Sequence, residues 1–437
     1  MNFNTLNPSS RVLARLQNCA SGQGSHMDAP AVAVIVAGDI EECKKLVSDV
    51  ITGVKNANGV AFTHFMPAMG YAAKINPQSA KFAQSWRQTS KSTATAIIKT
   101  NMVESVVIVG ECDVTVSGII LACIETNTPV AVLPFGKCNI ANIAEIKKPI
   151  TQLSGAIAGG KVTTTGGDEI ISREYMPKRQ GDMFSILETL GICQVGAGSN
   201  KRGGGKQIEA AIQTGAVAVK NAIQSVMPKK IFTKQSLQSV VDNALANNYA
   251  ICDLVHVLRL FNACGVETPI EMLFERMAKI GVPNVTLSKL SGTALGGLAY
   301  VQWLGDKPEP ISGRAWVYQT LEDADRALCN GSIPAQSIIV LQNMVGVDVS
   351  AIANVILGMG REREIAIATD GTCEPSNVLC VQLCTPDTYA NEEFSNIQNG
   401  DELEIDATRG RFNSDVNAKE LKTRAKRNVP KREERYF

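Results

Sequence analysis

Two short polar segments carry the residue types that could do chemistry in this chain. Cys112 and Asp113 follow one apolar run, and Asp370 and Glu374 follow another. Carboxylates and thiolates move protons or hold metal ions, and α/β folds bind ligands at the carboxyl ends of their strands. We therefore predict Cys112, Asp113, Asp370 and Glu374 as catalytic residues, with Asp113 also a candidate metal ligand.

The same residues have simple structural interpretations, which stay open at this point. Cys112 could be a small core thiol, and Asp113 could cap a helix by accepting backbone N–H bonds. An Asp-Gly pair after a strand is common in turns, and Glu374 could be an exposed loop residue. His256 lies in an apolar helical stretch, where a buried core histidine is more frequent than a catalyst.

The N-terminal half alternates strand and helix patterns, which predicts a parallel, doubly wound α/β sheet with helices on both faces. Continuous apolar runs rich in β-branched residues are typical of strands buried on both faces. They predict strands at Ala31 to Ala37, Gly59 to Phe62, Ser105 to Gly110 and Pro129 to Pro134.

The pattern changes to short strands after residue 290, so we predict a second domain. The expected domains are an α/β domain over residues 1–290 and a β-rich domain over 291–437. Helices are expected from Met183 to Ile280, with Gly203 to Lys206 as a helix-entry loop. The last ~20 residues, rich in Lys, Arg and Glu, are expected to form a solvated tail or an arm that covers a partner.

Composition excludes several classes of protein. The 43 basic and 42 acidic residues leave a formal net charge of only +1, which gives no electrostatic basis for nucleic-acid binding. No apolar run reaches the ~20 residues that span a bilayer. The 12 cysteines are dispersed and the 3 histidines lie far apart, so reduced thiols in a cytoplasmic protein are expected and a zinc site is not.

Motifs spread over most of the chain resemble the family of dihydroxy-acid dehydratase and phosphogluconate dehydratase. The matching segments are Ala68-Met69-Gly70, Glu111-Cys112-Asp113, Asn127 to Val130, Leu254 to Leu258, Leu290-Ser291-Gly292, Ile311 to Tyr318, Thr369-Asp370-Gly371, Thr385-Pro386-Asp387 and Ile397 to Asp401. The resemblance implies an N-terminal α/β domain, a C-terminal barrel-like swivelling domain, and a homodimer or higher homo-oligomer with the site between domains. It also implies that Ser291, Gly292 and Gly371 contact the substrate.

Family members use an iron-sulfur cluster and a magnesium ion to remove water from hydroxy acids. This chain departs from the family at most of the ligands. Only Cys112 matches a cluster cysteine, Val114 replaces a lysine next to Asp113, Gln342 replaces an acidic ligand, and Glu374 stands where the family has a catalytic serine. We therefore expect neither the iron-sulfur cluster nor magnesium.

Three functions remain open. The first is a diverged biosynthetic lyase that acts on a small hydroxy or amino acid without the cluster. The second is a catalytically silent paralogue that binds a small carboxylate or pairs with an active partner. The third is an assembly protein that uses the dimer surface of the family.

Overall fold

The computed structural model describes most of the chain in segments. These are residues 29–38, 40–69, 79, 82–136, 148–149, 152–163, 175–176, 183–247, 249, 251–267, 285–289, 298–303, 306, 308–344, 347–374, 376–383, 394–416 and 418–427. The chain forms two compact units, and each is described by itself. The first comprises residues 1–70, 85–142 and 179–268, and the second comprises 71–84, 143–178 and 269–437.

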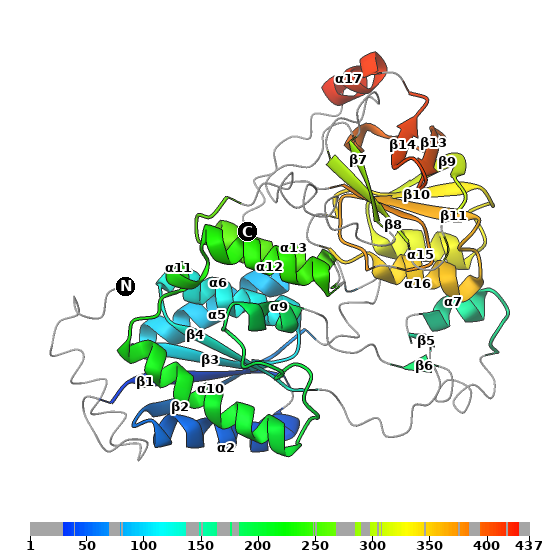
Figure 1. The fold of residues 1–437 in the computed structure, drawn as a ribbon. Helices are drawn as coiled ribbons and strands as arrows, with labels where there is room; N and C mark the ends of the chain where they lie inside the picture. The colour runs from blue at the N-terminus through cyan, green and yellow to red at the C-terminus, as the bar shows by residue number, and fades with distance from the viewer. Residues whose placement is uncertain are drawn as a thin grey trace. The chain divides into compact units, whose positions relative to one another are not determined.

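The first unit contains a four-stranded parallel sheet in the order β2-β1-β3-β4 (Figure 1). Its strands are β1 (Ala31–Ala37), β2 (Val60–Met66), β3 (Ser105–Gly110) and β4 (Val130–Pro134). β1, β3 and β4 are buried along their whole length, as their apolar runs require when helices cover both faces. The sequence prediction of all four strands is confirmed, with β2 four residues longer at its carboxyl end.

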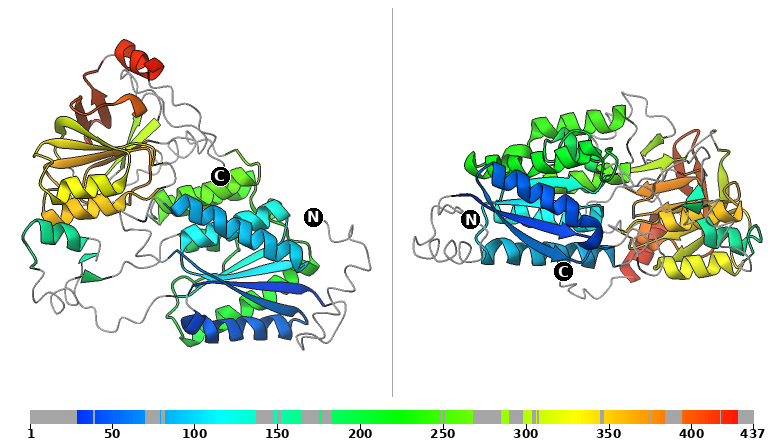
Figure 2. Two further views of the ribbon diagram at one scale, coloured as in Figure 1. Left: turned by 180° about the vertical axis from the view of Figure 1, so that it is seen from behind. Right: turned by 90° about the horizontal axis from the view of Figure 1, so that it is seen from below.

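Helices cover both faces of this sheet (Figures 1 and 2). Valines on β1 and β3 pack in one core with α2 (Ile40–Asn56) and α10 (Gly205–Ile223). The unit also contains α5 (Ala83–Thr100), α6 (Asp113–Thr126), α9 (Met183–Thr189), α11 (Pro228–Ile231), α12 (Lys234–Ala246) and α13 (Ile251–Ala263). These bounds agree with the predicted helices, although the stretch expected near Glu267 to Ile280 lies almost wholly outside the described residues.

The second unit is a mixed sheet of eight strands in the order β14-β13-β9-β10-β11-β12-β8-β7. The four central strands run parallel: β9 (Ile311–Tyr318), β10 (Ser337–Leu341), β11 (Ile365–Thr369) and β12 (Cys380–Leu383). Antiparallel strands flank them: β7 (Val285–Lys289), β8 (Leu298–Gln302), β13 (Glu402–Asp406) and β14 (Arg411–Ser414). The end strands β7 and β14 contact each other, so the sheet is nearly closed and barrel-like, as expected.

Elements that the strand pattern did not predict complete this unit. Helices α15 (Leu321–Cys329) and α16 (Ser350–Met359) form a core with one face of the sheet, and α7 (Leu153–Ala158) packs on α16. The short elements β5 (Lys148–Pro149), β6 (Tyr175–Met176) and η3 (Phe394–Asn396) also belong here. The boundary expected at residue 290 stays a prediction.

The expectation of a solvated tail is wrong for residues 418–427. They form helix α17 (Ala418–Arg427), whose Leu421 is buried in the core of the second unit. Arg424 makes a two-pronged ion pair with Asp401, at 2.7 and 3.2 Å. One buried leucine and one ion-paired, partly buried arginine dock this short helix, although most of its residues are charged or polar. Among the helices that the structure describes, none combines the length and apolarity needed to cross a bilayer.

Helices α7 and α16 cross so closely that their contact admits only glycine. A Cβ atom on Gly358 would lie 2.1 Å from the carbonyl oxygen of Gln152, and one on Gly155 would lie 2.0 Å from that of Val355. Backbone atoms cannot yield as a flexible side chain can, so the two helices would have to separate.

We predict that G358A lowers the free energy of unfolding by about 1–3 kcal/mol, because the added methyl group overpacks this contact. The melting temperature measured by circular dichroism should fall by several degrees. G205A is the control: no atom lies within 4 Å of its Cβ position, and its melting temperature should be unchanged or higher. Equal stability of G358A and the wild type would show that the helices are free to separate.

Candidate functional site

The carboxyl end of β3 leads directly into the first turn of α6. Cys112 is the N-cap residue, and α6 begins at Asp113. β3 pairs with β1 on one side and β4 on the other. In the strand order β2-β1-β3-β4, the chain reverses direction across the sheet between β1 and β3, and open parallel sheets bind ligands outside this point. The fold therefore places Cys112 and Asp113 where the strand pattern predicts a ligand.

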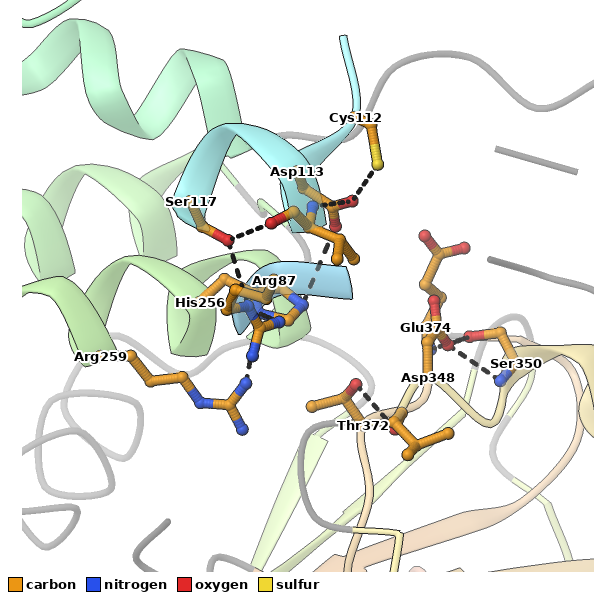
Figure 3. Close-up of polar contacts among 12 residues, drawn as sticks. Arg87, Cys112, Asp113, Ser117, His256, Arg259, Asp348, Ser350, Thr372 and Glu374 are labelled. Carbon is orange, nitrogen blue, oxygen red and sulfur yellow. Dashed lines mark hydrogen bonds and ion pairs between the residues drawn. The ribbon is translucent and has the colours of Figure 1, made fainter. Parts of the chain in front are cut away.

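Asp113 is buried and contacts groups on both carboxylate oxygens (Figure 3). Oδ1 accepts a hydrogen bond from the backbone N–H of Val114 at 2.9 Å and faces the Cys112 thiol at 3.9 Å. Oδ2 lies 3.8 Å from Nε2 of His256, whose side chain is only 5% exposed. The expectation that Asp113 is the helix cap is wrong, because Cys112 holds the N-cap position and Asp113 is the first helical residue, but its side chain does bind a backbone N–H of the first turn and also faces His256.

His256 lies on α13 between Asp113 and two arginines (Figure 3). Its Nδ1 atom is 3.4 Å from Nη2 of Arg87 and 3.4 Å from Nη1 of Arg259. Guanidinium groups only donate, so Nδ1 must accept, and we assign the ring proton of the neutral imidazole to Nε2, which faces Asp113. His256 therefore presents an N–H group to the carboxylate.

Further hydrogen bonds join the first turn of α6 to its surroundings. Nε of Arg87 donates to Oγ of Ser117 at 3.2 Å, and this hydroxyl donates to the carbonyl oxygen of Val114 at 3.0 Å. The backbone N–H of Met69, in the segment after β2, donates to Oγ1 of Thr115 at 3.1 Å. Three motifs of the sequence resemblance, around Met69, Asp113 and His256, therefore meet in one unit.

Sequence reasoning missed Arg87, Arg259 and Ser117 and treated His256 as a core residue. His256 is indeed buried, but it faces charged groups. One signal was available: His256 and Arg259 are spaced i, i+3 in an apolar stretch and so share one face of a helix. Arg87 lies in a polar helix, α5, where nothing in the pattern distinguishes it from a surface arginine.

In the second unit, Asp370 follows β11 and binds the loop that follows β10. Its Oδ2 accepts from the N–H of Asn343 at 3.0 Å, and its Oδ1 accepts from the N–H of Met344 at 2.8 Å. Burial raises the pKa of the Asp370 carboxyl, while these backbone hydrogen bonds oppose the shift. Asp370 thus holds two strand ends together.

Gly371 and Gln342 have related packing roles beside Asp370. A Cβ atom on Gly371 would lie 2.7 Å from the carbonyl oxygen of Val347, so the close backbone approach here is to the protein itself. Gln342 is buried and donates through Nε2 to the carbonyl oxygens of Phe394 and Ile397, at 2.8 and 3.0 Å. A carboxylate at position 342 would place a negatively charged oxygen against these two carbonyl oxygens and would repel them.

Glu374 is fixed through its backbone. Its N–H donates to Oγ of Ser350 at 2.7 Å, and this hydroxyl donates to Oδ1 of Asp348 (Figure 3). The Glu374 residue is partly exposed. Cys373 and Cys380 are both buried, and the neighbouring Cys380 thiol together with burial raises the pKa of Cys373. Ser291 and Gly292, predicted to contact the substrate, lie outside the described residues.

We predict a pH-dependent effect of D370N. The folded-state pKa of Asp370 is raised, so the folded protein binds this proton more tightly than the unfolded chain does; the resulting stability is present at low pH and is lost as pH rises through the folded-state pKa. The amide introduced by D370N cannot titrate. The melting temperature of the wild type minus that of D370N should therefore increase when the pH is lowered from 7.5 to about 4.5. A difference that shrinks on acidification would contradict the assignment.

Comparisons with known proteins match both units to one family. The family model described as dihydroxy-acid/6-phosphogluconate dehydratase N-terminal matches residues 31–289, and the corresponding C-terminal model matches residues 270–437. A dihydroxy-acid dehydratase from Pyrobaculum aerophilum is 22% identical, with 86% of this chain and 82% of the relative covered.

Two further relatives give the same result. Dihydroxy-acid dehydratase from Carboxydothermus hydrogenoformans is 22% identical over 90% of this chain and 87% of its own length. The one from Archaeoglobus fulgidus is 19% identical, with 93% and 91% covered. The resemblance read from the motifs is confirmed: the chain belongs to the dihydroxy-acid/6-phosphogluconate dehydratase family.

Proposed function

We propose that this protein is a diverged lyase that removes water from a small hydroxy acid, or an analogous group from an amino acid, without the iron-sulfur cluster of its family. One observation carries the proposal: the buried Asp113 carboxylate faces the imidazole of His256, which lies between it and the guanidinium groups of Arg87 and Arg259. Burying charged groups is costly, and such clusters are concentrated at functional sites.

The proposed chemistry is proton transfer by the protein's own side chains. In the dehydration of a 2,3-dihydroxy acid, C2 loses its proton to a base, the C3–O bond breaks, and the hydroxyl leaves as water after taking up a proton; the enol product becomes a 2-oxo acid. The carboxylate of Asp113 is the base, and the Nε2–H group of His256 orients it. Arg87 and Arg259 supply positive charge for a substrate carboxylate and for the negative charge that develops on it.

The residues present do not fit the cofactors of the family. Cluster ligation requires several thiolates, and Cys112 is the one cysteine at a matching position. The apolar Val114 is buried beside Asp113, and the amide of Gln342 offers two carbonyl oxygens an N–H group instead of offering a metal ion a carboxylate. Among the described residues, no group of three His, Cys, Asp or Glu side chains could hold a metal ion.

A second candidate function is a catalytically silent paralogue that binds a small carboxylate or acts as a partner or assembly subunit. The second unit favours this silent function, because both carboxylate oxygens of Asp370 already accept hydrogen bonds from backbone N–H groups. Asp370 and Glu374 stay predicted catalytic residues. For either function we propose a homodimer or higher homo-oligomer in the cytoplasm, in a biosynthetic pathway if the protein is catalytic.

We predict that protein purified without oxygen contains much less than one iron-sulfur cluster per chain, because the thiolates that would hold one are missing. Iron and acid-labile sulfide analysis measures this directly. A stoichiometric cluster would overturn the proposed mechanism and return the protein to the chemistry of its family.

We predict that, without added iron, the protein forms a 2-oxo acid from at least one member of a panel of 2,3-dihydroxy acids, sugar acids and hydroxy amino acids. Dinitrophenylhydrazine detects the product. D113N should lower kcat by about 10²-fold or more, as loss of an acid–base residue does.

H256Q and H64Q provide a matched pair of variants. His256 contacts Asp113, whereas His64 lies on the edge strand β2, so only H256Q should lose activity at a temperature where circular dichroism shows both variants to be folded. Ligand binding without turnover would favour the silent paralogue. If no compound of the panel is turned over or bound, the assembly function is the one that remains.

A further inference from the structure

A second feature lies beside Asp113, in the glycine-rich segment of residues 192–207. Its two ends are held firmly to the first unit. At the start, the N–H of Val132 donates to the carbonyl oxygen of Ile192 at 2.8 Å, and Glu188 accepts from the N–H groups of Gly196 and Gly198. At the far end, the buried Gln207 donates to the carbonyl oxygen of Pro134 at 2.6 Å. Residues 199–206 therefore cross the carboxyl end of β4 between two fixed points.

Arg202 holds the middle of this segment to the strand ends. Its Nη2 atom is 2.7 Å from Oε2 of Glu111, the first residue after β3. Its guanidinium also lies over the ring of Phe135, the first residue after β4, at 5.5 Å from the centroid. Both contacts are made at the sheet edge that carries Cys112 and Asp113.

The ion pair is exchangeable. The side chains of Arg202 and Glu111 are 26% and 46% exposed, and pairs of this kind are worth little against solvent. Gly203 has φ +71°, and no atom lies within 4 Å of its Cβ position, so no side chain packs over this point of the segment. Backbone hydrogen bonds fix the two ends of the segment, and the contacts of Arg202 tie its middle to the strand ends, so we call residues 199–206 the strap.

We propose that Arg202 binds the carboxylate of a ligand. When no ligand is bound, the carboxylate of Glu111 takes the place of the ligand and pairs with Arg202. A small carboxylate at this strand end offers the same two oxygens as Glu111, and arginine pairs with either carboxylate in the same geometry. The exposed Lys201 and Lys206 add positive charge to the strap. On exchange, Arg202 turns from Glu111 to the ligand and residues 199–206 change position.

This inference deepens the proposed function by naming the group that holds the ligand's negative charge, and it rests on that function only for the ligand class. It is tested by proteolysis and binding, whereas the proposed function is tested by turnover, so the two can fail separately.

The experiment compares wild type with E111Q, R202Q and R202K. E125Q is the control, because Glu125 pairs with Lys91 at the same 2.7 Å and with nearly the same exposure, 49% and 29%, at the other end of α6. Endoproteinase Lys-C reports strap opening by cleavage after Lys201 and Lys206. Calorimetry measures binding of glycerate, malate, gluconate and inorganic phosphate.

We expect E111Q to speed cleavage at Lys201 and Lys206 several-fold and to tighten carboxylate binding by about two- to five-fold, because an internal competitor is removed. R202Q should weaken binding about ten-fold or more, and R202K should fall between, because lysine keeps the charge but lacks the planar set of N–H donors of arginine. E125Q should match wild type in both assays.

Several results would overturn the proposal. They are unchanged cleavage in E111Q, equal carboxylate affinity of E111Q and wild type, equal affinity of R202Q and wild type, and an effect of E125Q as large as that of E111Q. Binding of phosphate alone would overturn the carboxylate class.

Discussion

A buried ionised group needs a partner, and the carboxyl end of β3 is arranged around this requirement. Asp113 enters the first turn of α6 with one oxygen on a backbone N–H group and the other toward His256. The imidazole in turn faces two guanidinium groups, which balance the carboxylate through a ring that need not be charged itself. Helices α5, α6 and α13 are thereby held in one arrangement, since displacing any of them would leave a charge without its partner.

The second unit meets the same requirement differently. Its parallel strands β9, β10 and β11 end in register, at Tyr318, Leu341 and Thr369. The polar residues that follow them bind backbone groups: Asp370 and Gln342 each make two such hydrogen bonds. Their hydrogen-bonding capacity is used to join loops, which makes this strand end rigid and leaves less of it for a ligand.

Strand positions could be predicted from the sequence because runs such as Ala31–Ala37 and Ser105–Gly110 are buried on both faces and therefore apolar throughout. Helix α17 could not, since a single buried leucine and one paired arginine carry its packing. The candidate site was half predictable: Asp113 stands at a strand end, whereas Arg87 is brought to His256 across 169 positions of sequence by tertiary structure alone.

The side chain of Gln342 is satisfied by the protein itself. An acidic residue at the end of β10 would need a cation to offset the two carbonyl oxygens that face it, whereas an amide satisfies both carbonyls by itself. With an amide at this position, no metal ion is needed to balance the two carbonyl oxygens. In the first unit the buried Val114 has no capacity to bind a metal, but Asp113 beside it faces His256, whose ring contacts the guanidinium groups of Arg87 and Arg259. Protein cations can then do for Asp113 what a metal ion does for an isolated carboxylate: they stabilise its charge and fix its direction.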